Sequence, residues 1–115
     1  MKSFACLLIA LGVVAGAFGA HGLKDLVSPE RLEVFKTASN YQITMSITLF
    51  LLASSRSLSM LVLYGLSFGI IVFSCSLYLL VILDLPILGA ITPIGGLSII
   101  ISLLAAAWQF KKLKT

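Results

Sequence analysis

The sequence predicts an all-α integral membrane protein with four transmembrane helices in an antiparallel, up-down bundle. Of the 115 residues, 60% are hydrophobic and 10% are charged, whereas soluble domains carry about 25% charged residues. The mean hydropathy is +1.16. Long apolar runs alternate with short polar stretches, and they lack the alternating polarity of barrel strands. Because only helices and closed barrels satisfy the backbone inside a bilayer, we expect these runs to be helices.

The first span is expected over residues 4–20, which are uncharged and just long enough to cross a hydrocarbon core about 30 Å thick. Lys2, the apolar run and Ala15-Gly-Ala17 also imitate the three parts of a signal peptide. Three further apolar runs follow, which favours a retained first span. This span ends in the segment Gly16-Ala-Phe-Gly-Ala-His-Gly-Leu23, which carries the single histidine, His21.

The stretch 23–40 is the main polar part of the chain and holds half of its charged side chains. Within it, Ser28-Pro29 predicts a helix start, with serine as the N-cap and proline at the first helical position. No helix breaker follows before Ser54. We therefore expect the first turns to form an amphipathic interfacial extension and residues 38–54 to form the second span.

The third and fourth spans are expected over residues 58–83 and 93–110. Asp84 and Pro86 end the third run, because aspartate is costly in the membrane core and proline lacks the backbone donor. Thr92-Pro93 repeats the N-cap and proline signal. Trp108 and Phe110, followed by lysines, form an aromatic and basic belt that is typical of a membrane interface.

Basic residues are distributed unequally between the two sides that four spans would create. One side would carry Lys2, Arg56, Lys111, Lys112 and Lys114, and the other Lys24, Arg31 and Lys36. The positive-inside rule then predicts that both termini are cytoplasmic. The basic tail accounts for much of the net charge of +4 as a lipid-headgroup anchor, so we expect no nucleic-acid partner.

Each expected span has a row of small or polar residues at helical spacing, as helix association in lipid requires. The expected packing positions are Gly12, Gly16, Ala20, Gly65, Gly69 and Gly95. The polar rows are Thr37, Tyr41, Thr44 and Thr48 in the second span, Ser67, Ser74 and Tyr78 in the third, and Ser98, Ser102, Ala105 and Gln109 in the fourth. We expect these faces to point into the bundle.

Polar residues are also expected to gather near the outer ends of the helices, around His21. This candidate cluster consists of His21, Tyr41, Gln42, Ser74, Ser76, Tyr78 and Thr92. His21 could cap the end of the first helix, sense protons or bind a substrate, or join Met45 and Cys75 as a soft-metal ligand. The sequence has no second histidine, no phosphate-binding glycine loop and no recognisable metal spacing. It therefore predicts no enzyme, no cofactor and no metal site.

Four ordered motifs resemble those of a known family: Gly16-Ala-Phe-Gly-Ala-His21, Thr37-Ala38 followed by Tyr41-Gln42, Ser74-Cys-Ser-Leu-Tyr78, and Gly89-Ala-Ile-Thr-Pro-Ile-Gly-Gly96. They look like the small bacterial inner-membrane proteins of domain-of-unknown-function family 423, also called uncharacterised protein family 0382. The resemblance covers nearly the whole chain and implies a four-span protein of the bacterial inner membrane. It implies no established activity.

Three departures from the family pattern bear on function. Met45 stands where the family usually has a histidine, Cys75 replaces a glycine, and Ser102-Leu103 replaces a late Gly-Trp. If the family used two histidines for chemistry, this chain would lack one. We therefore expect a non-enzymatic structural or accessory protein that packs with membrane lipids, with itself as a homo-oligomer or with a larger membrane partner. The alternative is small-molecule, ion or lipid transport or sensing at the cluster around His21.

Overall fold

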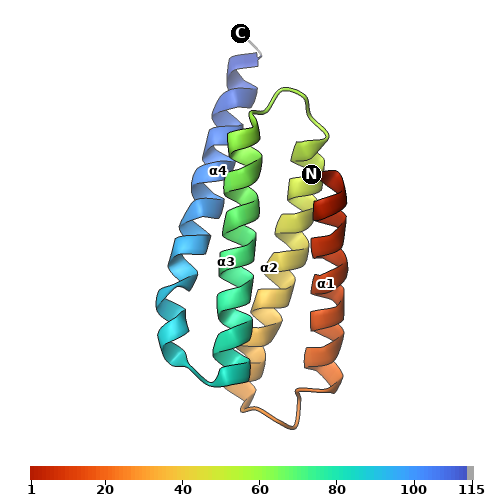
Figure 1. The fold of residues 1–115 in the computed structure, drawn as a ribbon, viewed down its shortest axis with the longest axis vertical. Coiled ribbons are helices and arrows are strands. Elements are labelled where there is room, and N and C mark those ends of the chain that lie inside the picture. Colours follow the sequence, from red (N-terminus) through yellow and green to blue (C-terminus); the bar gives the residue numbers. More distant parts are fainter. Residues whose placement is uncertain (114–115) are drawn as a thin grey trace.

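A computed structural model describes residues 1–113 of the chain (Figure 1). Lys114 of the expected basic tail lies outside the described residues. Within residues 1–113 the regular structure is entirely helical. Its elements are α1 (Lys2–His21), α2 (Pro29–Ala53), α3 (Met60–Leu83), the short 3-10 helix η1 (Pro86–Ala90) and α4 (Thr92–Leu113).

The ends of the helices follow local capping chemistry. α2 begins at Pro29, and the Ser28 hydroxyl accepts a hydrogen bond from the Arg31 backbone N–H at 3.3 Å, which is the cap that Ser28-Pro29 predicted. α3 ends at Asp84, whose φ of 54° is left-handed and stops the helix. Aspartate tolerates this conformation better than most residues. α2 is one continuous helix of 25 residues.

The four long helices lie side by side in chain order (Figure 1). α2 packs between α1 and α3, α4 packs on α3, and the backbones of α1 and α4 do not come into contact. The N-terminus, the connection between α2 and α3 and the end of α4 lie at one end of the protein (Figure 1). We expected all small-residue faces to point at a common centre. Instead α1 and α4 each turn that face towards a single neighbour.

Glycines set the two tightest helix contacts. A Cβ added at Gly12 would lie 2.7 Å from Ile43 Cγ1 of α2, and one added at Gly16 would lie 2.9 Å from Ser39 Oγ of α2. Ala20, expected in the same row, is exposed. Gly19 is buried there instead by the ring of Phe35, which would lie 2.8 Å from a Cβ added at this position.

The contact between α3 and α4 is closer still, because backbone meets backbone. A Cβ at Gly69 would lie 2.8 Å from both Gly95 O and Ile99 N. Gly95 lies against the backbone of Phe73, and Gly65 lies against the Ser102 hydroxyl. In lipid, such close packing supplies cohesion that apolar burial between helices cannot.

The buried face of α2 differs from the expected polar row. Thr37, Tyr41 and Thr44 are exposed, and Thr48 bonds within its own helix, to Thr44 O at 3.0 Å. The residues buried in their place are Phe35, Ala38, Ser39, Gln42, Ser46 and Leu49. Both rows have helical spacing, but the residues that lie against Gly12, Gly16 and Gly19 of α1 belong to the buried row: Gln42, Ser39 and Phe35.

Three segments are long and apolar enough to cross a membrane, among residues 1–113: Lys2–His21, Met60–Leu83 and Pro86–Leu113. Large apolar side chains cover the outside of these segments, including Leu61, which is 81% exposed, and Leu104, which is 65% exposed. α2 is less apolar, and its polar side chains Ser39, Gln42 and Ser46 are buried. The apolar surface therefore lies outside and much of the polar surface lies between helices, as expected of a protein dissolved in lipid.

Candidate functional site

Gln42 joins three helices through one side chain. Its Nε2 donates a hydrogen bond of 2.7 Å to Leu8 O of α1, and its Oε1 accepts one of 2.6 Å from the Tyr78 hydroxyl of α3. Gln42 is 5% exposed. A buried amide must find partners for both of its ends, and the two neighbouring helices supply them.

Serines flank this three-helix contact. The Ser39 hydroxyl, one turn before Gln42, donates to Gly12 O of α1 at 2.8 Å. On the other side of α2, the Ser74 hydroxyl of α3 donates to Ala38 O at 3.5 Å. The acceptors are backbone carbonyls on neighbouring helices, which can accept a second bond because each has two lone pairs.

A groove of about 240 Å³ opens beside Gln42. Its walls come from α1 and α3, and it is lined by Leu8, Leu11, Gln42, Ile70, Ile71, Ser74, Cys75 and Tyr78. The lining is mainly apolar, and the polar groups of Gln42, Ser74 and Tyr78 are already joined to protein partners. The groove therefore suits an apolar occupant better than a charged one.

The structure brings together only part of the expected cluster. Gln42, Ser74 and Tyr78 meet between α2 and α3. Ser76 and Thr92 meet separately between α3 and α4, with their hydroxyl oxygens 2.6 Å apart. The Thr92 hydroxyl also donates to Leu88 O of η1 at 3.4 Å, so both of these partners lie outside α4.

The two other members of the expected cluster lie apart. Tyr41 is 50% exposed and packs its ring on Phe73, with centroids 5.1 Å apart, in a different groove. His21 is exposed at the end of α1. It lies 13 residues beyond Leu8, or about 20 Å along the helix. Among residues 1–113, the His21 side chain makes no hydrogen bond or ion pair, so the three-helix contact is centred on Gln42.

Further polar side chains connect α3 with its neighbours. Gln109 of α4 reaches Ser59 at the start of α3, accepting from its backbone N–H at 2.9 Å and donating to its hydroxyl at 3.0 Å. The Ser98 hydroxyl donates to Gly65 O at 2.7 Å. Each bond again crosses between two helices, so the polar row of α4 is used for packing.

Arg31 of α2 caps the far end of α3. Its guanidinium donates to Val81 O, one of the last carbonyls of α3, and its Nε lies 3.7 Å from Asp84 Oδ1. The end of a helix carries partial negative charge on unpaired carbonyls, which a cation stabilises. This contact fixes the start of α2 beside the end of α3.

Ser39 and Arg31 were not among the expected site residues. The sequence did contain a signal that could have identified Ser39, because Ser39 lies three residues before Gln42 and so shares its helix face. Arg31 had none, since its partner is a backbone carbonyl 50 positions away. Within residues 1–113, no three His, Cys, Asp or Glu side chains are grouped so that they could hold a metal ion.

Comparison with known proteins identifies the family of this chain. Residues 15–96 match the family described as "Protein of unknown function (DUF423)". The chain belongs to this family. It is 42% identical over 101 residues to the UPF0382 membrane protein YwdK of Bacillus subtilis, covering 83% of this chain and 80% of the relative. A UPF0382 membrane protein of Staphylococcus epidermidis is 42% identical over 95 residues, or 79% of this chain and 78% of the relative. No solved structure matches.

The family resemblance inferred from the four motifs is thereby confirmed. The chain is a helical membrane protein, as its relatives' names and its apolar helices both indicate. Those names assign no activity to the relatives.

Proposed function

We propose that this protein is a non-enzymatic, structural or accessory component of the bacterial inner membrane. The observation that carries the proposal is the use of the Gln42 amide, which is buried and bonded to α1 on one side and α3 on the other. Ser39, Ser98 and Gln109 likewise bond to neighbouring helices. Side chains used for helix packing are not positioned for acid-base or nucleophilic work.

The proposal includes four spans that cross the membrane in alternating directions. α2 is the most polar of the four, but Ser39, Gln42 and Ser46 lie between α1 and α3 rather than towards lipid. Its 25 residues extend about 37 Å, which exceeds a hydrocarbon core of about 30 Å. The excess of about 7 Å corresponds to about five residues, so Glu30, Arg31 and Glu33 would form the interfacial extension, and the long side chain of Lys36 would reach back to the interface.

Both termini would face the cytoplasm. Lys2, Arg56, Lys111 and Lys112 belong to the end of the protein that holds the N-terminus and the end of α4, and Lys24, Arg31 and Lys36 to the opposite end. The excess of basic residues at the first end favours a cytoplasmic position. The bacterial relatives, which are named membrane proteins, support the bacterial membrane as the location.

Substitution of His21 and Gln42 in the cell tests the proposal against transport or sensing at His21. A deletion strain is screened for growth defects under osmotic, acid and detergent stress, and variants are returned at the native locus. His21→Gln should restore growth at wild-type protein abundance, because His21 lies outside the helix contacts. Gln42→Leu should reduce both abundance and rescue. A His21→Gln protein that is abundant and folded yet fails to restore growth would refute the structural proposal and support the alternative.

A further inference from the structure

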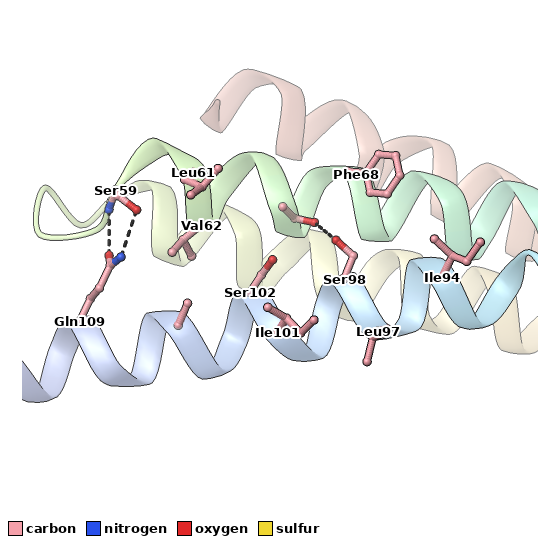
Figure 2. A pocket seen from close by; sticks show the side chains of 12 residues that line it. Ser59, Leu61, Val62, Phe68, Ile94, Leu97, Ser98, Ile101, Ser102 and Gln109 are labelled. Atoms are coloured by element: carbon pink, nitrogen blue, oxygen red, sulfur yellow. Dashed lines mark hydrogen bonds between the residues drawn. The ribbon is translucent and has the colours of Figure 1, made fainter.

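A second groove runs along the outside of α3 and α4. Its volume is about 470 Å³, and apolar side chains such as Leu61, Phe68, Ile94 and Ile101 form most of its lining. Figure 2 shows Ser59 and Gln109 at one end, with Ile94 and Phe68 towards the other. On α4 the lining extends from Ile94 to Gln109, about 22 Å at 1.5 Å per residue. This exceeds the depth of one leaflet, about 15 Å, which is half of the hydrocarbon core.

The polar end of the groove lies in a basic region. Arg56, in the loop that leads to Ser59, is exposed and makes no ion pair within residues 1–113. Lys111 and Lys112 follow Gln109 closely and add to the positive charge of this end of the protein. No acidic residue occurs in either segment, since 54–59 and 109–113 contain only basic charges.

We propose that this groove binds an anionic phospholipid, with one acyl chain along the apolar lining and the phosphate beside Arg56. The inference rests on the part of the proposed function in which α3 and α4 span the membrane with this end at the headgroups. Basic side chains at that depth attract anionic headgroups. A basic patch alone contacts only the headgroup. The groove also provides an apolar surface for the acyl chain of the same lipid.

Charge favours a lipid over a second copy of the protein in this groove. Two copies related by an axis along the membrane normal would bring their basic ends together. Like charges placed in this way repel. An anionic lipid neutralises the same charges, and its acyl chain matches the apolar lining.

Native mass spectrometry of the purified, delipidated protein tests the inference. The protein is titrated with phosphatidylglycerol or phosphatidylcholine that carry the same acyl chains. The variant Ala105→Trp fills the groove, because Ala105 lines it. Ala107→Trp is the matched control, since Ala107 is exposed and does not line the groove. Arg56→Gln removes one charge from an exposed loop and should leave the fold intact. It therefore tests lipid binding even if a tryptophan substitution disturbs folding.

Wild type and Ala107→Trp are expected to bind the first phosphatidylglycerol at least about fivefold more tightly than phosphatidylcholine, the effect of one basic side chain near headgroups. Ala105→Trp should lose that first lipid, and Arg56→Gln should lose most of the preference. Equal affinity for the two lipids, or equal binding by the two tryptophan variants, would overturn the inference while leaving the proposed function intact. A two-chain mass that Ala105→Trp reduces to one chain would assign the groove to a second copy and overturn it too.

Discussion

Replacing Gln42 with leucine is expected to weaken the protein more than any other single polar substitution in α2. Leucine has a similar size and is favourable in lipid, so the change removes the amide without leaving a large cavity. It breaks the bond to Leu8 O at 2.7 Å and the bond from the Tyr78 hydroxyl at 2.6 Å. The contacts between α2 and both of its neighbours should loosen together.

The magnitude follows from these two bonds. Interhelical hydrogen bonds in membranes average about 0.6 kcal/mol and reach about 1.7 kcal/mol, so losing two should lower the free energy of unfolding by about 1.2 to 3.4 kcal/mol. Tyr78→Phe removes only one, so it should cost about 0.6 to 1.7 kcal/mol. The double variant should cost less than the sum of the two, because both single variants break the same Gln42–Tyr78 bond.

Reversible unfolding in mixed micelles, followed by circular dichroism, measures these values. Thr44→Leu is the matched control, because Thr44 lies two residues away and is exposed; its free energy of unfolding should stay within about 0.5 kcal/mol of wild type. The reasoning is refuted if Gln42→Leu is as stable as Thr44→Leu, or if Gln42→Leu and Tyr78→Phe are strictly additive.

Two further pairs of variants test the helix contacts by the same unfolding measurement. Gly69→Ala should cost about 1 to 3 kcal/mol, because its Cβ would meet backbone atoms of α4 at 2.8 Å. Gly96→Ala should be neutral or stabilising by up to about 1 kcal/mol, since its Cβ meets only the Phe73 ring at 3.7 Å; equal effects would contradict the packing argument. Arg31→Gln should cost about 1.5 kcal/mol through its lost charged hydrogen bond. Asp84→Asn should cost less than about 1 kcal/mol because the Asp84 side chain is 70% exposed, and the reverse order would argue against capping of α3 by Arg31.

Local signals allowed several features of the fold to be predicted from the sequence. Ser28-Pro29 predicted the start of α2 because capping depends on adjacent residues. Gly12, Gly16, Gly65, Gly69 and Gly95 all lie where a Cβ would crowd a neighbouring helix. The arrangement of the helices in chain order could not be read in this way. It depends on which pairs of faces fit best, a property of two surfaces at once.

The candidate site was less predictable for the same reason. Thr37, Tyr41, Thr44 and Thr48 form a regular polar row in the sequence, yet the row that packs contains Ser39 and Gln42. Periodicity gives the spacing of a buried face but not its rotation about the helix axis. A rotation of one residue, about 100°, separates the two rows, and the close fit to α1 decides between them.

The most direct test of a structural role asks whether water reaches the side chains beside Gln42. Cys75 lines the same groove as Gln42 and Tyr78, so its labelling by a membrane-impermeant maleimide reports on an aqueous path. The protein is placed in proteoliposomes in a Cys6→Ala background, with reagent on both sides. A separate variant that combines His21→Cys with Cys75→Ala provides an accessible reference thiol at the exposed end of α1. Labelling in denaturant confirms that the Cys75 thiol can react with the maleimide.

We predict that Cys75 stays unlabelled in the bilayer while the reference thiol of the His21→Cys variant reacts fully. Labelling of Cys75 at a rate similar to that of the reference would contradict a groove that lipid keeps free of water, and would indicate a path for solutes.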